Sequence, residues 1–436
     1  MKLLQDRNLQ LSMIFVAALL VRIGVMFVME SYKFPDEGSF GFGYGETAKQ
    51  VVLGEGFSLG YYDSGAPRAT AVAPPGYVYF VALIFYLFGI YSTKAAIIIE
   101  IAQSLTAALT CLVFYQLGRR YHEKVGLLAA LAVAFYPPSI MFSIGRISPI
   151  ILVVLLLGLT MHYLLKIQAE RRDRDAIICG LLMGVNALFE PTVILFYIAA
   201  CLWLLLWSTN ARAIALKHSV MMGVVCILCL LPWTIRNYLA FGAFPVLKSS
   251  MGQHLLVGNN PYCNGVTFYC NDLYKVFSPE EQKELDQLDE VRANKIMFQK
   301  AIFFIKNDPG TFARSTLKKL YYYWSPVNPY RMTRYDTLRL LTYGPALLLA
   351  ALGILLTRKR WRETSLFLAL FLFYPLTYYV TQVTINRYRF AVEAFLLLPA
   401  AYAVVYLVEH FRQRFFAAVQ EQPAPSSTRQ LRTAKP

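Results

Sequence analysis

The sequence predicts an all-α polytopic membrane protein with about ten transmembrane helices, on three observations. Of its 436 residues, 57% are hydrophobic and only 16% are charged, against roughly 25% charged in an ordinary soluble domain. The mean hydropathy is +0.46. Long apolar runs recur along the chain, and about 20 apolar helical residues cross a hydrocarbon core of roughly 30 Å. This composition excludes a soluble globular enzyme, a disordered chain and a small disulfide-rich domain.

Ten apolar runs account for the predicted spans, and the two beside Glu190-Pro191 are short. An eleventh run, 74–90, is aromatic and begins with two prolines. It could be a further span, but we expect a helix lying in the membrane interface, because another span would invert everything downstream. The predicted spans are residues 11–29, 95–117, 125–142, 149–166, 176–189, 191–207, 219–235, 338–357, 364–382 and 390–408.

The charge distribution predicts the orientation of these spans. The net charge is +16, from 42 Lys and Arg against 26 Asp and Glu. With a cytoplasmic N-terminus, the inner segments are 1–10, 118–124, 167–175, 208–218, 358–363 and 409–436, which hold 19 of the 42 cations. Such an excess follows the positive-inside rule. The basic balance is therefore mainly a topology signal and not a sign of nucleic-acid binding. The first apolar run has no small-residue cleavage site, so we expect an anchor and not a signal peptide.

This orientation divides the chain into four parts. Residues 1–235 form an N-terminal transmembrane module that includes a first outer loop, 30–94. Residues 236–337 form a small, mainly helical periplasmic domain, 338–410 the C-terminal transmembrane helices, and 411–436 a disordered cytoplasmic tail. Within the domain, Ser278-Pro279-Glu280-Glu281 predicts a capped helix start, the helical stretch runs over 278–322, and a second helix follows Asp308-Pro309-Gly310.

The seven cysteines are too few for a disulfide framework. Cys263 and Cys270, both in the outer domain, could form a disulfide in an oxidising compartment or remain two thiols. The other five lie in apolar runs and are expected to be small core residues. They are Cys111, Cys179, Cys201, Cys226 and Cys229.

Acidic residues follow the first span in the outer loop. Asp36, Glu37 and Glu46 would lie near the boundary between membrane and water. A carboxylate there can act as a general base on a hydroxyl acceptor or help to bind a cation. The alternative is a solvated loop whose acids have no special role.

Basic residues stand at the outer ends of two spans. Arg387 and Arg389 flank Tyr388 in the last outer turn, where cations are costly unless they meet an anion. Guanidinium groups suit phosphate, although snorkelling to the lipid headgroups would also explain them. Lys248 and His254 follow the seventh span, as a possible site or as an ordinary polar loop.

Arg22 lies inside the first span. It could pair with an acid in the bundle or face a polar cavity. The residues show no P-loop, no G-x-S-x-G and no H-x-x-x-H spacing. The only D-x-D, Asp173-Arg174-Asp175, lies in a cation-rich cytoplasmic turn. We therefore predict no metal and no cofactor, and a metal-dependent transferase that uses a nucleotide sugar has little support.

Four segments resemble GT-C-type membrane glycosyltransferases, specifically the family 39-like proteins related to protein O-mannosyltransferases and the lipid A aminoarabinose transferase. They are YGETAKQVVLGEGFS (44–58), APPGYVYFVALIFYLFGIYSTKA (73–95), PWTIRNYLAFGAFPVLKSSMGQHLLVGNNP (232–261) and INRYRFAVEAFLLLPA (385–400). Their order agrees with the topology derived from charge. Family members often carry an acid beside the tyrosine of the first segment, whereas here Gly43 and Gly45 flank Tyr44.

The resemblance implies transfer of a sugar from a polyprenyl-phosphate donor to a lipid, glycan or protein acceptor at the outer face of a bacterial inner membrane, in a multi-pass protein with both termini cytoplasmic. An acid of the first outer loop would be the base, with Glu46 ranked first and Asp36 and Glu37 next. Basic residues would hold the leaving phosphate. The implied phosphate ligands are Arg387, Arg389 and Lys248, and the implied substrate contacts are Tyr44, Tyr388, His254 and Asn259.

Two other functions stay open at this stage. A transporter or flippase of lipid-linked saccharides often shows internal repeats and charges near the bilayer midplane. No clear repeat is visible here, and the candidate charges lie at the outer face. A polymerase or ligase would use a lipid-linked oligosaccharide as donor. The expected partners are the donor, the acceptor and membrane lipids, with no nucleic acid.

Overall fold

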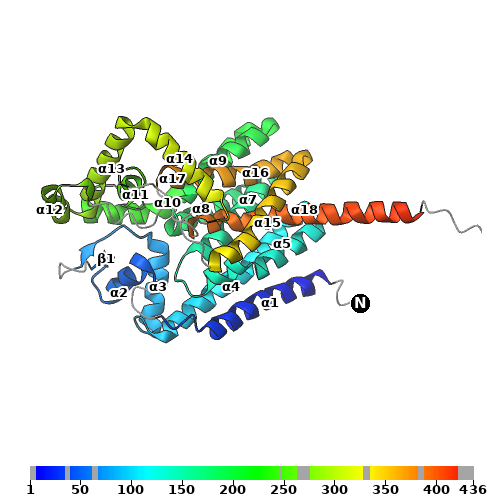
Figure 1. Ribbon diagram of the computed structural model, residues 1–436, viewed down its shortest axis with the longest axis horizontal. Helices are drawn as coiled ribbons and strands as arrows, with labels where there is room; N and C mark the ends of the chain where they lie inside the picture. The colour runs from blue at the N-terminus through cyan, green and yellow to red at the C-terminus, as the bar shows by residue number, and fades with distance from the viewer. Residues whose placement is uncertain are drawn as a thin grey trace, which may run out of the picture.

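The computed structural model describes residues 6–34, 40–60, 67–244, 247–262, 275–327, 334–381 and 387–420. The described chain is mainly helical, and its long helices run in one direction as a bundle (Figure 1). Strands β1 (Ser58–Leu59) and β2 (Arg68–Ala69) pair antiparallel in the first outer loop. The described parts of α1 and α18 begin and end, respectively, at the same end of the bundle. We call this the inner end, and the opposite end, with α2, α11 and α13, the outer end.

Six described stretches are long and apolar enough to cross a membrane, or seven if one bent pair is counted as a single span. This confirms a polytopic helical membrane protein, although it is fewer than the ten spans predicted. The predicted spans 176–189 and 191–207 are the short helices α8 and α9. The bundle helices are α1 (Arg7–Met29), α4 (Thr93–Gly118), α5 (Glu123–Phe135), α6 (Pro137–Ser143), α7 (Ile150–Glu170), α8 (Asp173–Phe189), α9 (Val193–Trp207), α10 (Arg212–Phe241), α15 (Arg334–Leu356), α16 (Trp361–Phe373), α17 (Leu376–Val380) and α18 (Arg387–Gln420).

Two predicted spans are interrupted. The stretch 125–142 is broken between α5 and α6, which bend by 52° at Tyr136. Pro137 and Pro138 follow the break, and proline disfavours helical backbone in the residue before it. Similarly, 364–382 is divided at Pro375 into α16 and α17. The spacing of apolar residues alone does not predict such breaks. The prolines in these stretches must be considered as well.

Arg22 forms hydrogen bonds at the break between α5 and α6. Its Nη1 donates to the carbonyls of Ala18 and Ala134, both at 2.9 Å, and its Nη2 donates to the Val133 carbonyl at 3.2 Å and to Ser139 Oγ at 2.9 Å. The last carbonyls of a helix have no partner within the helix, and in a membrane each unsatisfied one is costly. Arg22 thus caps the end of α5, which is neither of the two roles predicted for it.

The core is centred on α4, α7 and α18, whose inward faces are fully buried. Small residues allow close helix contact, as is common in membrane bundles. At Gly353 of α15, an added Cβ would lie 1.9 Å from the Pro399 carbonyl of α18. The five cysteines of the apolar runs are free thiols, buried or partly buried, as predicted. Cys263 and Cys270 lie outside the described residues.

Short helices cover the outer end of the bundle. In the first outer loop a π-helical turn (Gly41–Gly45) leads into α2 (Glu46–Val52), and α3 (Pro75–Phe88) is the apolar helix predicted from 74–90. The outer domain contains α11 (Met251–Gly258), α12 (Pro279–Gln287), α13 (Glu290–Asn307) and α14 (Pro309–Trp324). The predicted capping box at Ser278 is present. The stretch 278–322, predicted as helix, is three helices, and α14 follows Asp308 as predicted.

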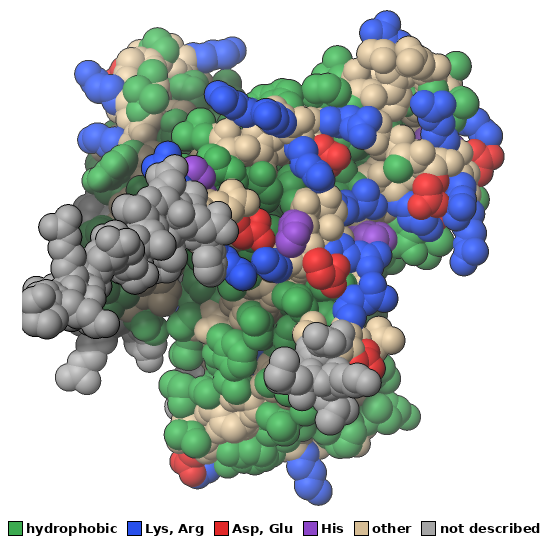
Figure 2. Space-filling model, turned by 90° about the vertical axis from the view of Figure 1, so that its right-hand side faces the viewer, with side chains coloured by type: hydrophobic (Ala, Val, Ile, Leu, Met, Phe, Trp, Pro, Cys, Tyr) green, Lys and Arg blue, Asp and Glu red, His purple; other side chains and the backbone are tan. Residues whose placement is uncertain are grey.

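The inner end carries the cation-rich turns. Figure 2 looks onto this end and shows many Lys and Arg side chains over it. Arg360 donates to the Arg120 carbonyl, and Lys124 pairs with Glu409 at 2.8 Å. Three segments predicted to share one side of the membrane are therefore neighbours. Helix α18 continues to Gln420, into the predicted tail from 411, and residues 421–436 lie outside the described part.

Candidate active site

A pocket of about 300 Å³ opens at the outer end, and we call it the outer pocket. Its lining comes from segments that are far apart in the sequence. Four of the predicted site residues, Tyr44, Lys248, His254 and Tyr388, meet there. The full lining is Tyr44, Pro74, Glu190, Pro191, Thr192, Leu247, Lys248, Ser250, Met251, His254, Thr377, Tyr378, Thr381 and Tyr388.

Tyr44 is positioned by the π-helical turn before α2. Gly41 has φ +89, and a Cβ there would lie 2.8 Å from the Ile147 carbonyl, so the turn needs glycine at this position. The Tyr44 ring packs edge-on against Tyr77, with centroids 5.3 Å apart. Tyr77 in turn donates its hydroxyl proton to Gln103 at 2.7 Å. The turn, α3 and α4 therefore hold this wall of the pocket together.

Lys248 is held from both sides by its chain neighbours. Trp233 donates its indole N–H to the Leu247 carbonyl at 3.0 Å. Ser249 donates its hydroxyl to the Glu290 carboxylate at 2.6 Å, and Thr70 does the same at 2.7 Å. A single carboxylate of α13 thus links the first outer loop to the segment after α10. This arrangement fixes the backbone from which the half-buried Lys248 reaches the pocket.

Glu190 is the acid among the described residues that line this pocket, and it was not among the predicted site residues. It is 9% exposed and ends α8, because Pro191 follows it. Thr192 donates to its carboxylate at 3.0 Å and lies 3.3 Å from the Tyr378 hydroxyl. Tyr378 is stacked on Tyr388, with centroids 4.7 Å apart. The sequence could have indicated it. An acidic residue between two apolar helices is energetically unfavourable in a membrane, and such a residue is a candidate for a functional role.

The acids predicted as catalytic are placed differently. The carboxylate of Glu46 accepts hydrogen bonds from Gln50 at 2.7 Å and Tyr91 at 3.0 Å. The Lys49 ammonium group lies 4.0 Å from the Glu46 carboxylate, and the side chain of Glu46 is 30% exposed. Within the described residues, Glu46 does not contribute to the lining of the outer pocket. Asp36 and Glu37 lie outside the described residues.

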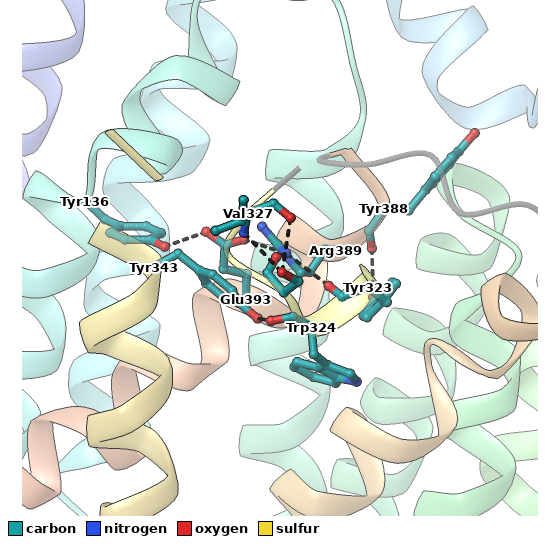
Figure 3. Close-up of polar contacts among 9 residues, drawn as sticks. Tyr136, Tyr323, Trp324, Val327, Tyr343, Tyr388, Arg389 and Glu393 are labelled. Carbon is teal, nitrogen blue, oxygen red and sulfur yellow. Dashed lines mark hydrogen bonds and ion pairs between the residues drawn. The ribbon is translucent and has the colours of Figure 1, made fainter. Parts of the chain in front are cut away.

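Arg389 lies behind the pocket, in a buried network with residues of its own helix and of α14 and α15 (Figure 3). Its Nε donates to Glu393 at 3.0 Å, and its Nη1 donates to the carbonyls of Tyr323 at 3.0 Å and Ser325 at 2.8 Å. Its guanidinium also lies 4.0 Å from the centroid of the Tyr343 ring. Arg389 is 1% exposed, so it holds the wall of the pocket and has no open access to it. The side chain of Arg387 lies outside the described part.

The same network reaches the break between α5 and α6. Tyr136, at the bend, donates its hydroxyl proton to Glu393. On the other side, Tyr323 donates to the backbone carbonyl of Tyr388 at 3.2 Å. The network therefore connects the broken helix with a ring that lines the outer pocket.

A second pocket of about 360 Å³ lies on the other side of this network. Glu393 is part of its lining, and Arg146 and Arg339 add two guanidinium groups to a mostly apolar wall. The remaining lining residues are Met29, Pro137, Pro138, Met141, Phe142, Ile144, Gly145 and Leu338. Two pockets thus flank one buried ion pair.

Asn259, predicted to bind substrate, connects three helices of the outer end through its side chain. Its side-chain N–H groups donate to the carbonyls of Leu255 at 2.9 Å and Val380 at 2.7 Å, and its oxygen accepts from Lys319 at 3.1 Å. It thereby ties α11 and α14 to the end of α17. Lys319 is fully buried, and this burial lowers the pKa of its ammonium group to about 8.

The stability of the protein should therefore depend on pH through Lys319. Between about pH 8 and pH 10 the folded state binds fewer protons than the unfolded chain, so the free energy of unfolding should rise with pH, by up to about 3 kcal/mol. Below pH 8 the cost of burying the charge is fully present. In Lys319→Met this rise should be absent. Melting of the two proteins in detergent over this range checks it, and identical pH dependences would contradict it.

Comparisons with known proteins agree with this architecture. The family model described as "Dolichyl-phosphate-mannose-protein mannosyltransferase" matches residues 72–235, less than half of the chain. The search of curated proteins gave no significant match.

Solved structures match over nearly the whole chain. The archaeal oligosaccharyltransferase AglB from Archaeoglobus fulgidus, in complex with an inhibitory peptide and a dolichol-phosphate, has a TM-score of 0.60 and 14% identity, over 96% of this chain and 52% of that one. The apo form of that enzyme gives 0.58 and 15%, over 97% and 53%. ArnT from Cupriavidus metallidurans bound to undecaprenyl phosphate gives 0.43 and 14%, over 95% and 81%.

The matches to the oligosaccharyltransferase confirm the resemblance inferred from the four segments: the chain has the fold of GT-C-type membrane glycosyltransferases. The chain spans about half the length of the oligosaccharyltransferase chains that it matches. Its own activity must therefore be argued from its site.

Proposed function

We propose that this protein is a glycosyltransferase that moves a sugar from a polyprenyl-phosphate donor to a lipid, glycan or protein acceptor at the outer end of the bundle. The observation that carries the proposal is the outer pocket. It combines a cation, a carboxylate and several hydroxyl groups within one space of about 300 Å³. A donor of this kind presents a phosphate and a sugar together, and both chemistries are matched there.

The roles follow from charge. Lys248 faces the leaving phosphate and stabilises its developing negative charge. The hydroxyl groups of Tyr378, Tyr388 and Thr192 offer hydrogen bonds to the sugar. Glu190 accepts the proton of the attacking hydroxyl group of the acceptor. Asp36, Glu37 and Glu46 remain alternative bases from the sequence, and Arg387 remains a predicted phosphate ligand.

The second pocket is the proposed place of the acceptor. Its apolar lining suits a lipid or another amphipathic acceptor, and its two arginines suit an anionic group on that molecule. In this proposal the acceptor is anchored in the second pocket, and its reacting hydroxyl group meets the donor in the outer pocket, beside Tyr388 and Glu190. Transfer of either a hexose or a pentose would be compatible with these dimensions.

The topology belongs to the same proposal. Ten spans result if the bent pair α5–α6 counts as one, if α8 and α9 each cross the membrane, and if Thr337–Val380 crosses twice, as α15 and as α16 with α17. Tyr44, Glu190, Lys248 and Tyr388 come from four segments assigned to the outer side by charge, and they line one pocket. That agreement supports an inner membrane protein with both termini in the cytoplasm.

The direct test is sugar transfer by the purified protein in detergent. Polyprenyl-phosphate sugars are offered with candidate lipid, glycan and protein acceptors, and the products are identified by mass spectrometry. A transporter or flippase needs two membrane-separated compartments and would give no product in detergent. A polymerase or ligase would give product only with an oligosaccharide donor. No product with any donor would refute the proposal.

Replacing Lys248 with glutamine should raise the KM for the donor by about tenfold or more, because a hydrogen bond to a charged group contributes roughly 1.5–3 kcal/mol. The KM for the acceptor should change much less. The control is Lys283→Gln, which removes an exposed cation of α12. Steady-state kinetics with each substrate varied in turn measures the effect. Equal changes in the two KM values would argue against phosphate contact by Lys248.

A further inference from the structure

We propose that helix α14 lies in the outer surface of the membrane, and that a pocket beside it holds the phosphate of an anionic membrane lipid. This site is separate from the outer pocket and does not depend on the transfer activity. In Figure 1 the α13–α14 hairpin projects sideways from the outer end of the bundle. Both helices run across the direction of α1 and α18. A helix with this orientation at this end lies along the membrane plane.

The first argument is an apolar face on α14. Leu317, Leu320 and Tyr321 are spaced so that they share one side of the helix. They are 65%, 39% and 67% exposed. The opposite side of the helix carries the buried Lys319 and Tyr323. An amphipathic helix that leaves such side chains exposed at the membrane boundary is typical of helices that lie in the interface.

The second argument is charge. Arg314 and Lys318 are one helical turn apart, exposed, and next to the apolar face. The sequence of α14, PGTFARSTLKKLYYYW, contains no acidic residue. Cations that flank an apolar helical face reach the phosphate layer while the apolar side chains enter the lipid. This complementarity favours anionic lipids over zwitterionic ones.

The third argument is a pocket of about 400 Å³ between α14 and the ends of α11 and α13. Arg314 and Lys318 line it, and Arg314 is oriented by a hydrogen bond of 2.9 Å to Thr311 Oγ1. The hydroxyl oxygen of Ser315 is buried there without a partner among the described residues. Asp308 also lines the pocket, but its carboxylate already caps α14 by accepting from the Thr311 N–H at 2.8 Å.

The side chains that line this pocket favour a phospholipid over a free phosphate ion as its ligand. Phe304, Ile305 and Phe312 line the same pocket. A free phosphate ion gains nothing from these apolar side chains, whereas a glycerophospholipid brings apolar carbon next to its phosphate. With the exposed apolar face beside it, the pocket fits the headgroup of a lipid whose chains continue into the bilayer.

Lipid binding by the full chain tests the proposal. The protein is purified, and the retention of phosphatidylglycerol and phosphatidylcholine is titrated by native mass spectrometry. The wild type should prefer phosphatidylglycerol. The double variant Arg314→Gln/Lys318→Gln should lower that preference by about tenfold or more. The matched control Lys283→Gln/Lys295→Gln removes two exposed cations from α12 and α13 and should leave the preference unchanged. An equal loss in both variants, or in neither, would overturn the site.

A second measurement tests the depth of the helix. Leu317→Cys carries a spin label in a chain where all seven native cysteines are replaced by alanine, because five of them are free thiols, and the protein is reconstituted into nanodiscs. The label should be accessible to oxygen and shielded from a water-soluble nickel reagent. A label at Lys283→Cys should show the reverse. If both labels are equally accessible to nickel, α14 does not lie in the membrane. Inorganic phosphate added as a competitor should not displace the bound lipid, and displacement would point to a site for free phosphate.

Discussion

Replacing Glu190 with glutamine should reduce kcat for sugar transfer by roughly 100-fold or more, the usual contribution of a positioned general base. Glutamine keeps the size of the side chain and can still accept from Thr192, so the donor KM should change little. Glu190 is the residue at which α8 ends, directly before Pro191. The substitution changes neither the end of the helix nor the proline that follows it. The change therefore removes the carboxylate charge and its basicity from the pocket.

The matched control is Glu46→Gln. That carboxylate contacts Gln50 and Tyr91 and does not line the pocket, so kcat should fall by less than about tenfold. Asp36→Asn and Glu37→Gln complete the series, because the resemblance assigns the base to the first outer loop. If any of the three loop variants abolishes transfer while Glu190→Gln retains it, the base belongs to the loop and Glu190 has a binding role.

Removing Arg389 alone should destabilise the protein by about 3–5 kcal/mol, the usual cost of leaving one charge of a buried pair without its partner. In Arg389→Met, Glu393 would keep only its hydrogen bond from Tyr136. The carbonyls of Tyr323 and Ser325 would also lose their donor. The free energy of unfolding, measured by denaturant titration in mixed micelles, should therefore fall strongly.

The double variant Arg389→Met/Glu393→Met should recover at least half of that loss, because no isolated charge remains. A partly exposed pair offers a comparison: Lys300→Met removes the partner of Glu281 at 2.8 Å, where the side chains are 22% and 48% exposed. It should cost much less than the loss of Arg389, because solvent screens this pair. If the double variant is as unstable as Arg389→Met, the network acts through its carbonyl contacts and not through the ion pair.

Much of the fold could be predicted because its signals are local. Apolar runs predicted a polytopic helical membrane protein, cation-rich turns predicted which turns are neighbours at the inner end, and the serine cap of α12 was visible in four residues. The breaks were harder. A proline after Tyr136 signals an interruption, but the angle depends on how Arg22 and Glu393 hold the two parts.

The site was only partly predictable, for a physical reason. Tyr44, Lys248, His254 and Tyr388 are polar residues of predicted outer segments, so topology alone brings them to one end. To predict Glu190 as a site residue, one must also consider how unfavourable a carboxylate is between two short apolar helices. Arg389 was expected to face an anion, and its true partner, Glu393, is one helical turn away. A sequence shows that a buried cation needs an acid without showing which one.

The cap that Arg22 provides for α5 has a consequence for biogenesis. Its partner at Ala134 lies 112 residues further along the chain. At about 5–20 residues per second, the ribosome needs roughly 6–22 s to make that segment. Until then, the guanidinium in the first span lacks the acceptors that α5 and Ser139 supply in the folded protein. The N-terminal helix is thus synthesised first, yet it can be secured only after the fifth helix has been made.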